Sequence, residues 1–121
     1  MRVFKNAWFG RFARKENISA QALLEAVERA EKGLIDADLG GGVIKQRIGR
    51  QGAGKSSGYR SVVIYRQGEK AFFVFGFAKS AQGNIRDDEE AQFKKAAKLM
   101  LALSDEQIRQ LLDNGQMEEV F

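Results

Sequence analysis

The sequence contains no cysteine, no histidine and no proline. Without cysteine and histidine, the chain has no disulfide, no thiol nucleophile, no imidazole base and almost none of the usual zinc ligands. Any chemistry must therefore use lysine, arginine, tyrosine, serine or carboxylates. The sequence also lacks the long apolar run of a membrane span or a secretory signal, so we expect a cytoplasmic protein.

Length and composition favour one domain. The chain has 121 residues, of which 44% are hydrophobic, and this is enough for one core but not comfortably for two. No proline, repeat or low-complexity segment marks a boundary. We therefore expect a single domain over residues 1–121.

The net charge is only +4, but the charges are distributed unevenly along the chain. Residues 104–121 are rich in carboxylates, whereas residues 43–66 contain no Asp or Glu. The cations of this basic segment are Lys45, Arg47, Arg50, Lys55, Arg60 and Arg66. Such a segment is expected to bind an anion.

The hydrophobic pattern predicts an α+β fold, with two helices before a small antiparallel sheet and one or two helices after it. Ser19 is the expected N-cap of the second helix, and Gly33 is its expected left-handed end. Ser104 and Gln107 form the pattern of a capping box, which begins an extra C-terminal helix over about residues 104–115. The predicted helices cover residues 6–17, 20–32, 87–103 and 104–115, and the predicted strands cover 2–5, 43–49, 58–67 and 70–78.

The stretch GRQGAGKS at residues 49–56 matches the phosphate-loop pattern G-x-x-x-x-G-K-[ST]. A phosphate loop needs a strand before it and a helix after it, because the phosphates bind the N–H groups of the first helical turn. Here an alternating strand precedes the glycines, and a β-branched and aromatic run from Tyr59 to Tyr65 follows them. The pattern therefore favours the tip of a β-hairpin over a nucleotide site.

The predicted hairpin gathers cations on a sheet surface. Alternation places Lys45 and Arg47 on one face of their strand, about 6.5 to 7 Å apart, which suits neighbouring phosphates. Tyr59 and Arg60 enter the next strand close by, with Lys55 at the loop tip. A sheet face with several cations and an aromatic ring is typical of an RNA-binding platform. The alternative is a solvated face whose charges serve solubility alone.

The same residue types can support RNA cleavage. Attack by the 2′-hydroxyl requires a base for the hydroxyl proton, charge stabilisation at phosphorus and a proton for the leaving 5′ oxygen. Without histidine, a lysine is the candidate base, because neighbouring cations lower the pKa of an ammonium group, and arginines stabilise the transition state. Because positioning contributes much of the barrier reduction, we expect a partner that presents the RNA.

The stretches LGGGVIKQRIGRQGAGKSSGYRSVVIYR and FFVFGFAKS, followed by a helix with an acidic start, resemble the RelE/HigB group of type II toxin–antitoxin toxins. The GGG-x-x-K-x-R pattern and the GKSSGYR element are most similar to the HigB-like subgroup. The resemblance covers about residues 1–103 and implies a RelE/ParE-like sandwich that cleaves mRNA on the translating ribosome without metal or cofactor. It also implies a cognate antitoxin, of the HigA-like type with a helix-turn-helix part.

The resemblance implies site residues as well. It assigns Lys45, Arg47 and Arg60 to phosphate binding and catalysis, and it assigns RNA-binding roles to Lys55, Tyr59, Lys79 and Arg50. Ser80 stands where RelE has an arginine, and no clear counterpart of the C-terminal tyrosine of RelE lies near Ile85. These differences leave the general base and the general acid unassigned.

Two other functions remain open from the sequence. The first is a non-catalytic or gyrase-directed toxin of the ParE kind on the same fold, and the second is a nucleotide-binding enzyme. Damage to DNA supercoiling would favour the first, and stabilisation by ATP with magnesium would favour the second.

Two apolar sets complete the predictions. Phe72, Phe73, Phe75 and Phe77 are expected to lie mostly in the core of the sheet. The apolar residues of the C-terminal segment are expected either to pack on the domain or to form a surface for a partner, and the sequence does not decide between them. These residues are Ile108, Leu111, Leu112 and Met117.

Overall fold

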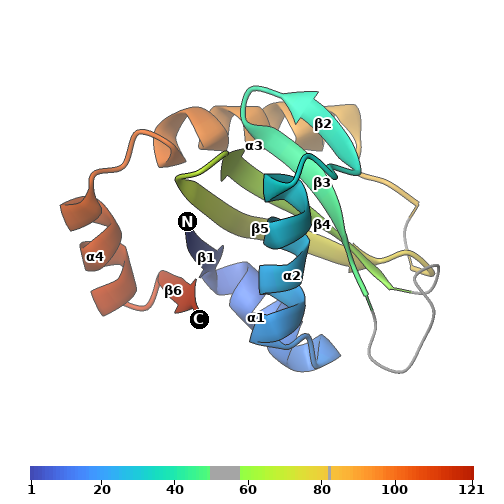
Figure 1. The fold of residues 1–121 in the computed structure, drawn as a ribbon, viewed down its shortest axis with the longest axis horizontal. Helices are drawn as coiled ribbons and strands as arrows, with labels where there is room; N and C mark the ends of the chain where they lie inside the picture. The colour runs from blue at the N-terminus through green and yellow to red at the C-terminus, as the bar shows by residue number, and fades with distance from the viewer. Residues whose placement is uncertain (50–57, 82) are drawn as a thin grey trace.

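The computed structural model describes residues 1–49, 58–81 and 83–121, which form one six-stranded sheet with helices on both faces (Figure 1). The helices are α1 (Ala7–Glu16), α2 (Ala20–Glu31), α3 (Asp87–Met100) and α4 (Asp105–Asp113). The strands are β1 (Arg2–Asn6), β2 (Ala37–Gly40), β3 (Val43–Ile48), β4 (Tyr59–Arg66), β5 (Lys70–Ala78) and β6 (Met117–Val120). This α+β architecture confirms the predicted fold class.

The order of strands across the sheet is β2-β3-β4-β5-β1-β6. Strands β3, β4 and β5 form the predicted antiparallel meander, and β1 joins it in parallel beside β5. Strand β2 lies in a segment for which the sequence predicted only a turn-rich connection. The chain reverses from β2 into β3 through Gly40, Gly41 and Gly42, all with positive φ, a backbone conformation that favours glycine.

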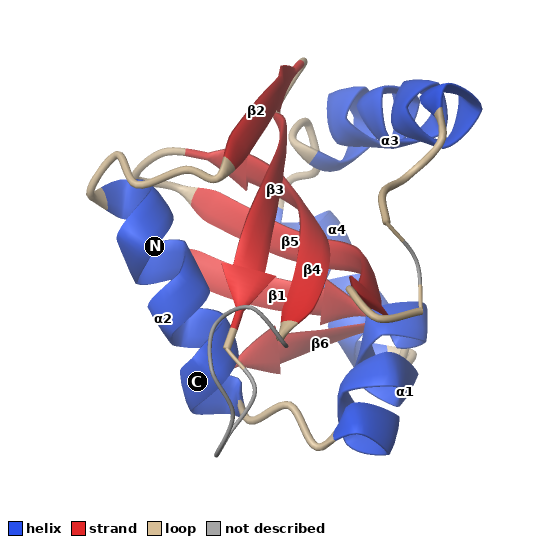
Figure 2. Ribbon diagram, turned by 90° about the vertical axis from the view of Figure 1, so that its right-hand side faces the viewer, coloured by secondary structure: helices blue, strands red, loops and turns tan. Residues whose placement is uncertain are grey.

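Each face of the sheet has its own hydrophobic core. Helices α1 and α2 cover one face through Phe9, Leu23 and Val27, whereas α3 and α4 cover the other through Ala97 and Ile108. Figure 2 shows α2 and α3 on opposite sides of the sheet. Both cores draw on the predicted aromatic run. Phe72, Phe73 and Phe77 are buried, and Phe75 is half-buried.

Helix ends agree with the predicted capping residues. The Ser19 hydroxyl accepts a hydrogen bond from the Ala22 N–H at 3.1 Å, and Gly33 adopts φ +83° just after α2. Ser104 and Gln107 form the predicted capping box, in which each side chain accepts from the other residue's backbone N–H. These local signals therefore define where α2 and α4 begin.

The C-terminal segment packs on the domain. Ile108 of α4 is fully buried, and the chain then forms strand β6, which pairs antiparallel with β1. The helix predicted over about residues 104–115 corresponds to α4, which ends at Asp113 with Asn114 as its C-cap and Gly115 at φ +79° just beyond it. Met117 is buried within β6, where the unpaired edge of β1 offers backbone hydrogen bonds that a longer helix would leave unsatisfied.

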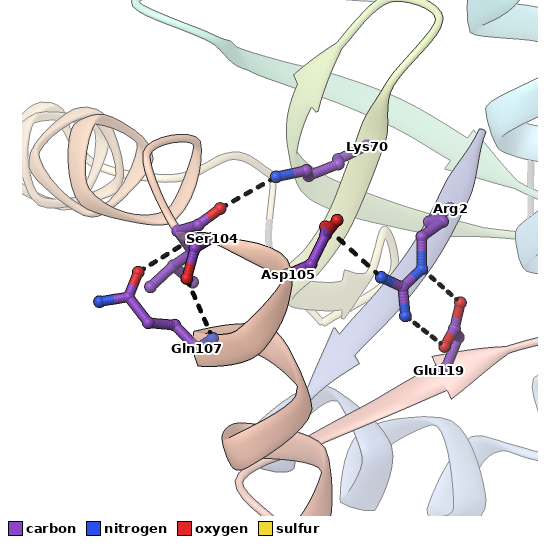
Figure 3. A network of polar contacts seen from close by, with 7 residues as sticks. Arg2, Lys70, Ser104, Asp105, Gln107 and Glu119 are labelled. Atoms are coloured by element: carbon purple, nitrogen blue, oxygen red, sulfur yellow. Dashed lines mark hydrogen bonds and ion pairs between the residues drawn. The ribbon is translucent and has the colours of Figure 1, made fainter.

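Polar contacts fasten this segment to the first strand (Figure 3). The Arg2 guanidinium donates to both carboxylate oxygens of Glu119, at 3.0 and 2.9 Å, and lies 3.9 Å from the Asp105 carboxylate. The hydrogen bond to Glu119 raises the pKa of Arg2 above its ordinary value. Lys70 of β5 donates to the Leu103 carbonyl oxygen at 3.0 Å. The Arg2 charge at this edge is therefore paired with carboxylates, and the Lys70 ammonium group is hydrogen-bonded to the backbone.

Across the described part of the chain, no helix has both the length and the apolar character that a membrane crossing requires. Nor do three His, Cys, Asp or Glu side chains gather there in a way that could hold a metal ion.

Candidate functional site

Strands β3 and β4 form the predicted hairpin. Their antiparallel register pairs Arg47 with Arg60 and Ile48 with Tyr59. The residues that precede and follow the glycine-rich stretch are thus strands, as the hairpin prediction requires, whereas a phosphate loop would continue into a helix. The glycine-rich tip itself, with the predicted RNA-binding residues Arg50 and Lys55, lies outside the described residues.

Alternation along β3 and β4 separates apolar from cationic side chains. Ile44 and Ile48 point into the core under α1 and α2. Lys45 and Arg47 lie on the opposite face, and the register brings Arg60 beside Arg47 on that face. The structure therefore brings together the three residues predicted to be catalytic.

The three cations line one cleft with a volume of about 280 Å³. Phe77 of β5, the register partner of Arg60, contributes an apolar wall. Gly83 and Asn84, from the segment between β5 and α3, line it as well. The cleft therefore combines cations, an apolar ring and amide groups within reach of one another.

The cleft cations are not neutralised by carboxylates. Within residues 1–49, 58–81 and 83–121, neither Lys45, Arg47 nor Arg60 forms a salt bridge. The Lys45 ammonium donates instead to the neutral Asn84 Oδ1 at 2.9 Å. Asp36, the one carboxylate among the described residues that line the cleft, accepts from the Arg47 backbone N–H at 2.6 Å and lies 3.8 Å from Arg29. An anion entering the cleft would meet three cations that form no ion pair with the described carboxylates.

Two predicted RNA-binding residues do not line this cleft. Tyr59 is only 4% exposed, because alternation turns it to the face covered by α1 and α2. There its ring packs edge-on against Phe12 of α1. Its hydroxyl donates to the Glu16 carbonyl oxygen at 3.4 Å. Lys79 is exposed just beyond the end of β5, and its backbone N–H donates to the Gly58 carbonyl oxygen. The structure thus makes Tyr59 a packing residue and leaves Lys79 outside the cleft.

The sequence did not predict that Asp36, Asn84 and Phe77 would belong to the cleft. Asp36 and Asn84 lie in turn-rich segments, and the local sequence there does not indicate that either residue will contact Lys45 or Arg47. Phe77 was predicted, but as a core residue. The turn-forming residue types in these segments predict a loop, but they do not predict which strand the loop will pack against.

The arrangement can bind a polyanionic chain and act on its phosphates. Arg47 and Arg60 present guanidinium groups that donate in a planar fork suited to phosphate oxygens, and Lys45 adds a flexible ammonium group. Cations placed where negative charge develops stabilise a phosphorane-like transition state. The cleft therefore has the charge and the residue types that strand cleavage without a metal needs.

Comparison with known sequences defines the family. A search of curated proteins gives no significant match to the chain. The family model described as "RelE toxin of RelE / RelB toxin-antitoxin system" matches residues 1–120, which is nearly the whole chain. The chain therefore belongs to the RelE toxin family and is the toxin of a toxin–antitoxin system, whose partner is a cognate antitoxin.

Proposed function

We propose that this toxin is an endoribonuclease that cleaves mRNA on the translating ribosome and so inhibits translation. The observation that carries the proposal is the convergence of Lys45, Arg47 and Arg60 in one cleft without a neutralising salt bridge from the described residues. Membership of the RelE family supports the same activity. The reaction needs no metal, because its charge stabilisation comes from these cations.

The proposed reaction is attack by the ribose 2′-oxygen on the adjacent phosphorus. The 2′-hydroxyl loses its proton, a bond forms from that oxygen to phosphorus, and the bond to the 5′ oxygen breaks as that oxygen takes up a proton. Arg47 and Arg60 stabilise the charge on the non-bridging oxygens, and Lys45 is positioned to take part in proton movement. The products are a 2′,3′-cyclic phosphate and a 5′-hydroxyl.

The ribosome supplies what the cleft lacks. The described residues that line the cleft provide charge and an apolar wall, whereas cleavage also needs the RNA in the in-line geometry, in which the 2′-oxygen, phosphorus and 5′-oxygen are aligned. A ribosome that holds the mRNA codon rigidly would provide this alignment, and positioning of this kind is worth roughly 7 to 11 kcal/mol in favourable cases. We therefore expect cleavage of mRNA only when ribosomes are present.

The GGG-x-x-K-x-R pattern of residues 40–47 supports a finer assignment to the HigB-like subgroup. The cognate antitoxin is then of the HigA-like type and carries a helix-turn-helix part. This assignment concerns the partner and does not alter the chemistry proposed for the cleft.

Single alanine substitutions test the proposed activity. Lys45→Ala and Arg60→Ala each remove one cleft cation and are expected to lower mRNA cleavage in a reconstituted translation reaction by roughly a hundredfold, as removal of one transition-state donor typically does. Growth arrest on expression should be relieved in parallel. Arg66→Ala is the matched control, because Arg66 lies on the same strand but outside the cleft and bonds to the Leu101 carbonyl.

Two outcomes would contradict the proposal. Unchanged cleavage in both cleft variants would remove these residues from the site. Loss of DNA supercoiling control without mRNA cuts would instead identify a gyrase-directed toxin of the ParE kind.

A further inference from the structure

The backbone of Arg47 lies where strand β2 stops pairing with β3. Strand β2 begins at Ala37, which pairs with Lys45. Arg47 lies two residues further along β3 and therefore has no residue of β2 beside it. Two side chains take the place of the missing strand. Asp36 Oδ2 accepts from the Arg47 N–H at 2.6 Å, and the Arg29 guanidinium donates to the Arg47 carbonyl oxygen.

These contacts also show which kind of ladder pair Arg47 forms with Arg60. Because the N–H and C=O of Arg47 point towards Asp36 and Arg29, they point away from β4. In an antiparallel ladder, a residue pair whose backbone groups point away from each other is the non-hydrogen-bonded pair, with the shorter Cα separation of about 4.5 Å. Arg47 and Arg60 are therefore a close register pair whose side chains leave the same face of the sheet, and like charges in such a pair repel.

The supporting side chains are themselves held by helix α2. Asp36 and Arg29 lie 3.8 Å apart as an ion pair, so the two groups neutralise one another and leave the cleft charge unchanged. The Asp36 backbone N–H donates to Gln46 Oε1 at 2.8 Å. Gln46 is 1% exposed, and its Nε2 donates to the Ala26 carbonyl oxygen of α2 at 2.9 Å. A continuous set of hydrogen bonds thus runs from α2 to the backbone of Arg47.

We propose that Asp36 and Arg29 are positioning residues that hold Arg47 against the repulsion of Arg60, so that both guanidinium groups meet one RNA phosphate. This inference rests on the function proposed for the cleft. Asp36 acts through the backbone of Arg47 and not on the RNA itself. Without this support, the end of β3 would be free to move, and the two arginines would separate.

Substitutions at Asp36 separate the hydrogen bond from the charge. Asp36→Ala removes the acceptor for the Arg47 N–H and is expected to weaken binding of a fluorescently labelled short single-stranded RNA by about tenfold, the effect of one charge-assisted hydrogen bond. Asp36→Asn keeps an acceptor oxygen, so we expect a loss of less than about threefold. Asp38→Ala is the control, because Asp38 lies two residues away and its side chain accepts from the Gly40 N–H and not from Arg47.

A double-mutant cycle with Arg47→Ala provides the readout that a purely structural role would not move. If Asp36 acts through Arg47, Asp36→Ala should have no further effect on RNA binding or on cleavage in a translation reaction once Arg47 is alanine. Thermal melting of each full-length variant shows whether it is folded. Should Asp36→Ala fail to fold, Asp36→Asn and Arg29→Lys continue the cycle, the latter because lysine lacks the fork that reaches both Asp36 and the Arg47 carbonyl.

Three results would overturn the inference. Additive losses in the cycle would show that Asp36 does not act through Arg47. An equal loss in Asp36→Asn and Asp36→Ala would mean that the carboxylate charge acts directly. If Arg47→Ala alone changes neither binding nor cleavage, the proposed function of the cleft fails together with the inference, whereas an effect of Arg47→Ala with additive losses leaves that function intact.

Discussion

Two charged regions lie at opposite ends of this protein and are built in opposite ways. Helix α4 lies at one end of the long axis with the β1–β6 edge beside it, and the end of β3 and the start of β4 lie towards the other (Figure 1). At the first, Glu119 binds Arg2, and Glu118 lies 3.1 Å from Arg14. At the second, Arg47 and Arg60 stand side by side, and neither forms an ion pair with the described residues.

The difference shows how the same residue types serve stability in one region and binding in the other. Paired charges at the β1–β6 edge satisfy one another and hold the C-terminal segment on the sheet. Unpaired like charges in the cleft oppose folding slightly, yet they provide the positive potential that attracts a phosphate chain. Regions that bind or catalyse are commonly less stable than they could be for this reason.

The largest expected effect comes from removing the buried anchor of the C-terminal segment. Ile108 of α4 is fully buried, so Ile108→Ala should lower the free energy of unfolding by about 2 to 5 kcal/mol through lost burial and the cavity left behind. Urea unfolding measures this change. Leu99→Ala is the control, because Leu99 is 73% exposed on α3 and should change stability by less than about 0.5 kcal/mol. A small effect at Ile108 would mean that α4 does not stabilise the domain.

A smaller effect is expected at the ion pair beside it. Arg2→Ala removes the two hydrogen bonds to Glu119 and should lower the free energy of unfolding by about 1 kcal/mol, since Arg2 is 41% exposed and solvent screens the pair. Cleavage by the folded variant should be unchanged. Arg109→Ala, which removes only an exposed contact to Glu106, serves as the control. Loss of cleavage in Arg2→Ala would show that this edge contributes to function.

The smallest effect on stability should have the opposite sign. Arg60→Gln removes the repulsion with Arg47 and is expected to raise the free energy of unfolding by about 0.3 to 1 kcal/mol, while cleavage falls by at least about tenfold. Calorimetric melting and the translation reaction measure the two changes. Arg66→Gln tests whether the gain is specific, because Arg66 faces Glu69 and not another arginine. A less stable and still active Arg60→Gln would contradict the comparison between the two ends.

The sequence predicted much of the fold because its signals are local. The alternation of Lys45 and Arg47 with buried isoleucines identified β3, and Ser19 and Ser104 identified helix starts, since a strand's period and a helix cap depend on a few neighbouring residues. The same alternation placed Tyr59 opposite Arg60, so its position away from the cleft was also within reach of the sequence.

Other features of the fold required contacts between distant segments. Strand β6 forms because β1 presents an open edge, and no pattern within residues 117–120 indicates which strand will accept it. Asp36 and Asn84 reach the cleft because β2 and the segment after β5 are packed against the end of β3, a placement set by the whole sheet.

The amino-acid sequence by itself determined the strand period, the helix caps and the cluster of cations on one hairpin face, because each depends on backbone geometry over a few residues. Only the tertiary structure decided which charges are neutralised and which remain available, because an ion pair depends on the distance between side chains that lie far apart in the chain. That distance depends on strand order and register, which settle only when the two cores form.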